Sequence, residues 1–443
     1  MSSITAPPLR VAIIGGGIAG LAATTAFLKL KDHGANIKID VYEAAPVFAE
    51  IGAGVSFASR FCWVYSIESV TLTTALRMMG AGDALDAVAG PPGDDADMWF
   101  HFVVAEAGPN SGKSIMEVRG KDAARGNVHR ADFLDQLIRR VPKDVAHFHH
   151  RLASYEPHDT GVTLKFESGQ SAECDVLVAS DGIKSATRRC MYERKGLDLE
   201  TQKARFSNWV AWRGLISKEK FREIFGPEAK DKMMLCGYRK HILHFPVRNG
   251  ELVNIVGFVQ DLDHKKLGNH TGPWAEERPR SEMLEDFADF NEQCLQMLKC
   301  IENPSIWGIF ELPDIESCID ERVVLIGDAD HATTPHQGAG AGQALEDALF
   351  IASLLCHSKT ASTSAKERPA AIRKALQVYE QTRHERGVKV KRTSREAGLL
   401  YEMCGVDGEG RDTDKMGENL RTRMPWIWDY DTQAELSKAF AML

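Results

Sequence analysis

The chain has 443 residues, of which 44% are hydrophobic and 26% are charged, as is usual for soluble globular proteins. This composition excludes a disordered chain, a collagen and a small disulfide-stapled domain. Lys and Arg total 54 against 62 Asp and Glu, and the resulting net charge of -8 argues against a general nucleic-acid binder.

Targeting and redox features of the sequence agree with one another. No stretch approaches the length of about 18 apolar residues that a transmembrane helix needs, and the N-terminus lacks the apolar core of a signal peptide. Nine cysteines run from Cys62 to Cys404 without a CxxC pair, which is typical of reduced thiols. We therefore expect a cytoplasmic protein that contacts neither membranes nor nucleic acids.

A βαβ unit is predicted at the start of the chain. Arg10–Ile14 is a short apolar run typical of a buried parallel strand, and a glycine-rich turn and a predicted helix follow it. Ile37–Tyr42 is a second, β-branched run. Two further runs of the buried parallel type, Cys174–Ala179 and Arg322–Ile326, each end at a turn that contains aspartate.

The middle of the chain predicts a different kind of sheet. Trp209–Ile216, Ile242–Val247 and Leu252–Val259 are rich in aromatic and β-branched residues. Asn249-Gly250, between the last two, is a strong hairpin turn. Residues 206–310 are therefore expected to form a second domain on a largely antiparallel sheet.

The glycine-rich turn has the form G-x-G-x-x-G. Gly15 permits a tight turn, Gly17 lets the backbone approach a pyrophosphate, and Gly20 allows close packing of helix on strand. Glu43, which closes the second strand, is placed to accept hydrogen bonds from a ribose. The pattern predicts dinucleotide binding, although glycine loops also serve packing alone, and it does not separate FAD from NAD.

Two later motifs do separate them. Asp181–Arg188 has the form D-G-x-x-S-x-x-R, and Gly327–Gly340 has the form G-D-x-x-H-x-x-x-P-x-x-G-x-G. With the N-terminal motif, they resemble the flavoprotein aromatic hydroxylases, the single-component FAD monooxygenases of the p-hydroxybenzoate and salicylate hydroxylase type. The resemblance is nearest to the fungal salicylate hydroxylase-like group and extends from Arg10 to about Leu355. Arg130 matches a further FAD-contacting arginine of that family.

The resemblance implies roles for residues of the G-D motif. The Asp328 carboxylate is expected to accept a hydrogen bond from the hydroxylated chain that links pyrophosphate to flavin. Pro335 is expected to lie against the flavin ring, near the oxygen site. Gly54, in the earlier Gly52–Phe57 segment, is a further expected cofactor contact.

The loop Gly338–Gly342 precedes a helix predicted over Gln343–Leu355. Gly340 and Ala341 are expected to present backbone N–H groups to the pyrimidine edge of the flavin. A helix N-terminus favours a nearby negative charge by roughly 0.3–1 kcal/mol, and reduced flavin is anionic. The alternative is a glycine-rich loop that serves packing only.

The D-G motif has two interpretations. Asp181 is either a turn residue that caps the following helix or, as the resemblance implies, a residue between the FAD pyrophosphate and the approaching nicotinamide cofactor. Arg188 then has a supporting role.

On the substrate side, Arg213 is the candidate catalytic residue, because a guanidinium can pair with a substrate carboxylate or phenolate. Its alternative is a salt bridge between domains. Phe245 stands where related dearomatising enzymes of fungi carry a substrate-anchoring tyrosine. His241 and His244 are candidates to replace it, whereas His331 is expected to be architectural.

One segment departs from the family pattern. Arg60–Thr74, rich in aromatic and β-branched residues, intervenes where a helix would normally follow almost at once. It is either a real insertion over the flavin or an artefact of the gene model.

The sequence therefore predicts an α/β fold in which a Rossmann-type FAD-binding domain carries an inserted sheet domain and a C-terminal helical region. The expected boundaries place the FAD-binding domain in residues 1–205 and 311–358, the substrate-binding sheet in 206–310 and the helical region in 359–443.

The resemblance implies a monooxygenase of phenols or aromatic carboxylic acids. NADPH or NADH reduces FAD, the reduced flavin captures O₂, and a C4a-hydroperoxyflavin hydroxylates the small aromatic substrate. The sequence shows no metal-spaced cluster or nucleophilic triad. An oxidative dearomatase or epoxidase of secondary metabolism and an inactive FAD-binding relic are the alternatives, and the oligomeric state stays open.

Overall fold

The computed structural model describes residues 7–48, 64–66, 70–88, 97–120, 127–248, 250–267 and 274–443. Gly54 lies outside these residues. Of the Arg60–Thr74 segment, only β3 (Val64–Ser66) and the beginning of α2 (Val70–Met78) are described, so the nature of that segment stays a prediction. Arg130 opens α4 (Arg130–Ile138), but its side chain lies outside the described part.

A six-stranded sheet carries the segments that were predicted to be buried and parallel. Its order is β18-β19-β11-β1-β2-β7, and every neighbouring pair is parallel except β18 with β19. All residues of β11 and β19 are buried, which explains their continuously apolar sequences. The strands are Leu9–Ile14 (β1), Ile37–Tyr42 (β2), Ala146–His147 (β7), Val176–Ala179 (β11), Ile319–Asp320 (β18) and Val323–Leu325 (β19).

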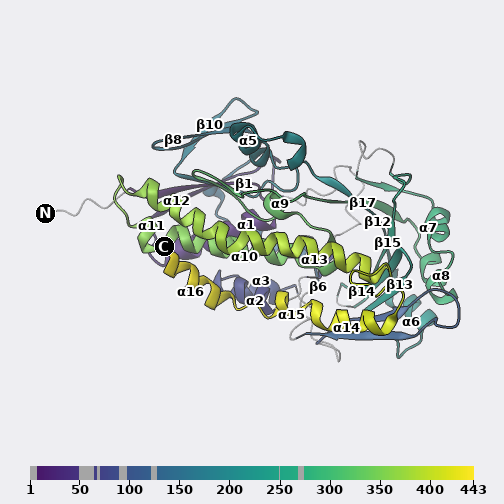
Figure 1. The fold of residues 1–443 in the computed structure, drawn as a ribbon. Coiled ribbons are helices and arrows are strands. Elements are labelled where there is room, and N and C mark those ends of the chain that lie inside the picture. Colours follow the sequence, from purple (N-terminus) through teal and green to yellow (C-terminus); the bar gives the residue numbers. More distant parts are fainter. Residues whose placement is uncertain are drawn as a thin grey trace.

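Helices cover one face of this sheet, and a small antiparallel sheet covers the other (Figure 1). Helices α1 and α10 pack on each other, α12 packs on α10, and on the opposite side β8, β9 and β10 pair in a three-stranded sheet beside α5. These elements are Ile18–Asp32 (α1), Gly340–Cys356 (α10), Arg368–Tyr379 (α12), Leu152–His158 (β8), Gly161–Phe166 (β9), Ser171–Cys174 (β10) and Ala186–Lys195 (α5).

A second, eight-stranded sheet has the order β16-β17-β12-β15-β14-β13-β4-β5, and only β13 and β4 are parallel. Six strands come from the stretch expected as residues 206–310, and Val247 pairs with Leu252 across the predicted hairpin. Two more, β4 and β5, come from within residues 1–205, so the sheet is wider than the sequence suggested. The strands are Met98–Val104 (β4), Ser114–Arg119 (β5), Arg205–Ser217 (β12), Met233–Gly237 (β13), Lys240–Val247 (β14), Leu252–Gln260 (β15), Ala275–Glu277 (β16) and Ser305–Glu311 (β17).

A long C-terminal helical segment joins the two sheets (Figure 1). It continues from α12 through a π-helical turn, Glu380–His384, into α13 (Glu385–Tyr401). Among the described residues, no helix combines the length and apolar composition that a membrane span requires. The remaining elements are Gly82–Asp86 (α3), Asn127–His129 (β6), Lys218–Phe225 (α6), Arg280–Asp286 (α7), Glu292–Lys299 (α8), Asp328–His331 (α9), Ser358–Ala361 (α11), Thr413–Arg423 (α14), Pro425–Trp428 (α15) and Thr432–Met442 (α16).

The two faces of the eight-stranded sheet have different partners, because side chains alternate along a strand. On β12, Val210 and Trp212 belong to an apolar cluster with residues of α6, α7 and α8. Trp209 and Ala211 belong to the other face, where the Trp209 ring contacts His336 with centroids 4.9 Å apart. The second face therefore meets the segment that carries the G-D motif.

His244 lies on the helix-covered face. It is fully buried, its ring centroid lies 4.7 Å from that of Phe221 of α6, and its Nδ1 lies 3.2 Å from the carbonyl oxygen of Asp231. Burial lowers the pKa of His244 to about 4. The folded protein therefore binds a proton at this ring less readily than the unfolded chain does.

We expect His244 to make the protein less stable as the pH falls from about 6.5 towards 4, because only the unfolded state gains the proton in that range. His244→Phe should remove up to one proton from this dependence, which is about 1.4 kcal/mol per pH unit. Denaturant unfolding of both proteins across this range measures the difference, and parallel pH profiles would contradict the assignment.

Candidate active site

Four of the predicted site segments meet at one edge of the parallel sheet. The strands β19, β11, β1 and β2 are neighbours in this order, and their carboxyl ends lead into Asp328, Asp181, the Gly15 turn and Glu43. The turns are in contact, because a Cβ atom added to Gly15 would lie 2.5 Å from the carbonyl oxygen of Ser180. Ligands of open α/β sheets bind at such an edge, outside the carboxyl ends of the strands.

The glycine turn has a tight side and an open side. A Cβ atom on Gly20 would lie 1.9 Å from the carbonyl oxygen of Gly15, whereas none of the described atoms lies within 4 Å of one on Gly17. Helix α1 begins directly after Gly17, and no described side chain caps it. Its first turn therefore presents backbone N–H groups and the positive end of the helix dipole to an anion.

Glu43 is held beside this turn. It is 8% exposed, its Oε2 accepts a hydrogen bond of 2.6 Å from the Gly16 N–H, and its Oε1 accepts one of 2.7 Å from the Ala45 N–H. These contacts orient the carboxylate at the end of β2. A hydrogen bond from a ribose to Glu43 stays a prediction.

Asp181 makes the contacts of a helix cap. Its Oδ1 accepts a hydrogen bond of 2.6 Å from the Ser185 hydroxyl, and its Oδ2 accepts two of 3.0 Å from the N–H and hydroxyl of Thr187, at the beginning of α5. Of the two interpretations, capping is therefore the one that these contacts support. Contact with a nicotinamide cofactor is still a prediction.

Arg188 connects the D-G turn to the G-D turn. The side chain is 1% exposed, Nη1 donates to the carbonyl oxygen of Ala329 at 2.7 Å, and Nη2 donates to that of Ile183 at 2.6 Å. Burial lowers the pKa of Arg188 to about 10, which still leaves the guanidinium charged at neutral pH. Arg188 thus supports the backbone beside Asp328. Its part in cofactor binding stays a prediction.

The G-D motif forms a short helix, a 3-10 turn and the beginning of α10. Asp328 is exposed at the first residue of α9, and the half-buried Pro335 opens the 3-10 turn Pro335–Gln337. Helix α10 begins at Gly340, three residues before its predicted start, and Ala341 is 8% exposed. No described side chain caps α10, so its N-terminus is also open to an anion.

Helix α13 packs closely on the two histidines of this motif. A Cβ atom on Gly387 would lie 2.3 Å from Cδ2 of His331, and one on Gly398 would lie 2.8 Å from Cε1 of His336. His331 is buried, and its Nε2 lies 2.7 Å from Oδ2 of Asp347. These contacts agree with the architectural role expected of His331.

Arg213 lies on the sheet face that meets the G-D segment. It is two residues after Ala211 and four after Trp209 on β12, so the three side chains share one face, and it pairs with Ser305 of β17 and Val256 of β15. Its guanidinium carbon lies 5.2 Å from the ring centroid of Trp307. The expectation that this part of β12 faces the cofactor-binding segment is therefore consistent with the fold.

The two histidine candidates of β14 are separated by the sheet. His241 lies on the same face as Arg213 and stacks on Phe258, with ring centroids 4.8 Å apart. His244 lies on the opposite face, beneath α6, so the suggestion that it contacts substrate is wrong. Phe245 lies on the face of His241 and is 2% exposed, and its ring offers no hydrogen bond.

Sequence reasoning missed two buried residues between His241 and the G-D segment. Glu402 is fully buried, its Oε2 accepts a hydrogen bond of 2.8 Å from Nε1 of Trp209, and its Oε1 lies 3.0 Å from Nδ1 of His241. His336 lies 5.5 Å from His241 between ring centroids, and burial holds its pKa well below the usual range. His336 could have been found from the sequence, because it lies within the G-D motif, whereas no sequence pattern marks Glu402.

Comparison with known proteins decides the family. A model of the FAD binding domain family matches residues 138–394. A salicylate hydroxylase of Pseudomonas putida is 37% identical over 98% of this chain and 94% of its own length. The chain belongs to the FAD-dependent aromatic-ring monooxygenases. These flavin enzymes use FAD with NADH or NADPH, and this member is such an oxidoreductase.

Other relatives agree on the family and the fold. The 6-methylsalicylate 1-monooxygenase of Aspergillus terreus is 32% identical over 96% of this chain and 90% of its own length. A solved salicylate hydroxylase substrate complex superposes with a TM-score of 0.84 at 34% identity and covers 98% of both chains. The predicted α/β fold with a C-terminal helical region is confirmed for this flavin monooxygenase.

The glycine turn gives a test of the strand edge. Gly20→Ala should destabilise the protein by about 3 kcal/mol, because the new methyl group meets the backbone of Gly15. Gly17→Ala, the matched control, should change stability by less than about 1 kcal/mol, since the space around it is open. Denaturant unfolding of the two flavin-free variants checks this contrast, and equal losses would contradict the close packing at Gly20.

Proposed function

We propose that this enzyme hydroxylates a small phenolic carboxylic acid of the salicylate type, using FAD, NADH or NADPH, and O₂. The observation that carries the proposal is the position of Arg213, a cation on the sheet face that meets the G-D segment. The salicylate hydroxylase and 6-methylsalicylate 1-monooxygenase relatives support the substrate class, because the names of both enzymes refer to an ortho-hydroxylated benzoate.

The residues at the strand edge fit FAD. The open space at Gly17 and the uncapped N-terminus of α1 suit a pyrophosphate, and the exposed carboxylate of Asp328 suits the hydroxyl groups of the ribityl chain. Glu43 suits the adenosine ribose, and Gly340 and Ala341 at the N-terminus of α10 suit the flavin pyrimidine edge. When bound, FAD supplies two-electron transfer from the nicotinamide cofactor and activation of O₂.

Residues of the eight-stranded sheet would bind the substrate. The Arg213 guanidinium can pair in bidentate fashion with a carboxylate, and the Trp307 ring beside it supplies an apolar wall for an aromatic ring. The Glu402 carboxylate fixes the orientation of His241, which lies on the same face of the sheet as Arg213. Together these groups would hold an acidic phenol against the flavin side of the sheet and keep water away from it.

Phe245 favours hydroxylation over oxidative dearomatisation. A dearomatase of this family anchors the phenolate through a tyrosine hydroxyl, and the buried Phe245 ring has no such donor. An acidic substrate that is anchored by Arg213 through its carboxylate does not need that contact.

The purified protein should be yellow and should oxidise NADH or NADPH faster with salicylate than without it. Absorbance spectra and oxidation rates test this, with benzoate as a control that keeps the carboxylate and lacks the phenol. Mass spectrometry of the product then separates hydroxylation, decarboxylative hydroxylation and dearomatisation. A yellow protein whose rate of NADH or NADPH oxidation is not raised by any hydroxybenzoate would contradict the substrate class.

Arg213→Ala should raise KM for salicylate by roughly 10–100-fold, because a charge-assisted hydrogen bond is worth about 1.5–3 kcal/mol. FAD content should not change, since Arg213 lies on the substrate sheet. Arg205→Ala is the matched control, an exposed arginine at the beginning of the same strand. Steady-state kinetics on both variants decide, and an unchanged KM in Arg213→Ala would remove Arg213 from the substrate site.

A further inference from the structure

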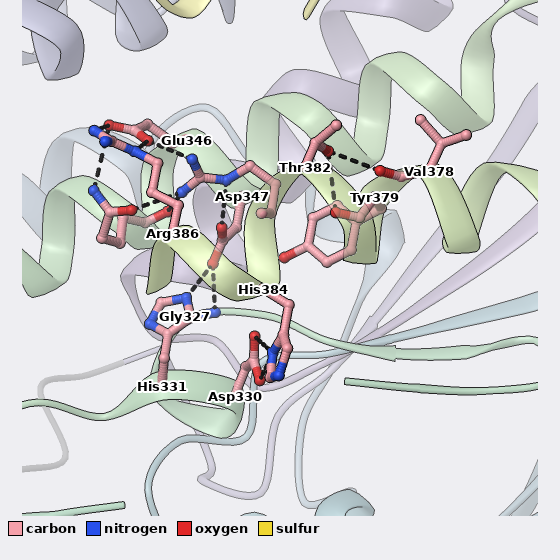
Figure 2. A network of polar contacts seen from close by, with 12 residues as sticks. Gly327, Asp330, His331, Glu346, Asp347, Val378, Tyr379, Thr382, His384 and Arg386 are labelled. Atoms are coloured by element: carbon pink, nitrogen blue, oxygen red, sulfur yellow. Dashed lines mark hydrogen bonds and ion pairs between the residues drawn. The ribbon is translucent and has the colours of Figure 1, made fainter. Parts of the chain in front are cut away.

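A buried network of charged side chains lies behind the G-D turn (Figure 2). Its centre is the pair of Arg383 and Asp347, which are both fully buried, and Glu346 and His331 form ion pairs with this centre. Arg386 of α13 forms a further ion pair with Glu346. The two residues of the central pair and their partners Glu346 and His331, four in all, come from three elements: the π-helical turn, helix α10 and helix α9. Of the four, only His331 belongs to the G-D motif described above.

One side of the network holds the G-D turn. Oδ2 of Asp347 accepts a hydrogen bond of 3.0 Å from the Gly327 N–H and lies 2.7 Å from Nε2 of His331. Gly327 has a φ of +59°, a conformation that favours glycine, and it directly precedes Asp328. Asp347 therefore fixes both ends of the short segment that presents Asp328.

The other side holds the beginning of α10. Nε of Arg383 donates to Oδ1 of Asp347 at 2.9 Å, and Nη1 donates to Oε2 of Glu346 at 2.6 Å. Nη2 donates to Oε1 of Gln343 at 2.9 Å. One guanidinium thus joins three residues in the first turns of α10, the helix whose N-terminus we assign to the flavin pyrimidine edge.

The π-helical turn explains how Arg383 reaches this position. A π-turn inserts an extra residue into a helix and leaves local carbonyl groups without their usual partners. Here the Thr382 hydroxyl donates to the carbonyl oxygens of Val378 at 2.8 Å and Tyr379 at 3.1 Å. The next residue, Arg383, donates to Asp347 and Glu346 of α10. Nδ1 of His384 lies 2.9 Å from Oδ1 of Asp330 in α9 (Figure 2).

Each charged group of the network has a partner of opposite charge. Burial alone would lower the pKa of His331, but the Asp347 carboxylate outweighs it and raises that pKa to about 9. Burial alone would raise the pKa of Asp347, yet the charges of His331 and Arg383 hold it below its usual range. Buried ion pairs contribute little net stability compared with apolar residues of similar size, so a gain in stability does not account for this one, and its contacts point to a geometric role.

We propose that Arg383 and Asp347 are positioning residues that fix the orientation of the Gly327–Asp328 turn relative to the N-terminus of α10, and thereby the affinity and reduction potential of FAD. The proposal rests on the flavin contacts proposed above. A turn that is tied to α10 through one carboxylate cannot shift without moving the helix. Neither residue needs to touch the flavin for this effect.

The test uses full-length Asp347→Asn and Arg383→Lys proteins. Asp347→Asn keeps the shape of the side chain and one acceptor, but places an amide against the donors of His331 or Arg383. Arg383→Lys keeps the charge, but its ammonium group cannot span three partners. Glu380→Gln is the matched control, because Glu380 lies in the same π-turn and accepts hydrogen bonds from the Ser317 hydroxyl and the Cys318 N–H instead.

Three quantities are measured: the dissociation constant of FAD by titration of flavin-free protein, the midpoint potential of bound flavin, and the melting temperature of the flavin-free protein. Both network variants should weaken FAD binding by about tenfold or more and lower the potential, because α10 no longer faces the reduced flavin correctly. Glu380→Gln should keep FAD binding within about twofold of wild type, even where its melting temperature falls equally.

The proposal is overturned if both network variants retain wild-type affinity and potential, or if Glu380→Gln loses FAD to the same extent. Should Asp347→Asn fail to fold, Arg383→Lys alone decides. Asp328→Ala separates the underlying assignment from this one. If Asp328→Ala keeps its full FAD content, the proposed flavin contacts are contradicted. If Asp328→Ala loses FAD while Asp347→Asn and Arg383→Lys bind FAD like the wild type, only the positioning role is contradicted.

Discussion

The parallel register of four neighbouring strands is the constraint on which the rest of the site depends. Ile14 pairs with Tyr42 on one side and with Ala179 on the other, and Ala179 pairs with Leu325. Because these strands end in register, turns that are up to about three hundred residues apart along the chain lie at one edge. A one-residue slip in any strand would reverse its side chains and move its turn out of line.

The sequence was sufficient for the parts of this arrangement that local patterns encode. Apolar runs identified β1, β2, β11 and β19, and the glycine and aspartate turns identified the edge they share. Strand alternation could also have excluded one histidine, since His241 and His244 are three residues apart and must point to opposite faces. It could not say which one, because the covering helices decide that.

What the sequence did not reveal are contacts between distant buried polar groups. Glu402 joins Trp209 across 193 residues, and Arg383 joins Asp347 across 36 residues through a π-turn. No local period marks either contact, because each depends on how helices of the C-terminal segment pack on the two sheets. Helix α13 contacts both halves of the molecule: Arg395 binds Glu311 in the eight-stranded sheet, and Ser394 binds Thr334 in the G-D motif.

The two glycines of α13 have an evolutionary consequence. Glycine in a helix interior is less favourable than alanine by about 1 kcal/mol, so Gly387 and Gly398 are tolerated in exchange for the space that His331 and His336 occupy. A larger residue at either position would therefore collide with the histidine that faces it. If one of these histidines were replaced by a smaller residue during evolution, the facing glycine could be replaced by alanine without a collision. The two substitutions would then be expected to occur in the same proteins.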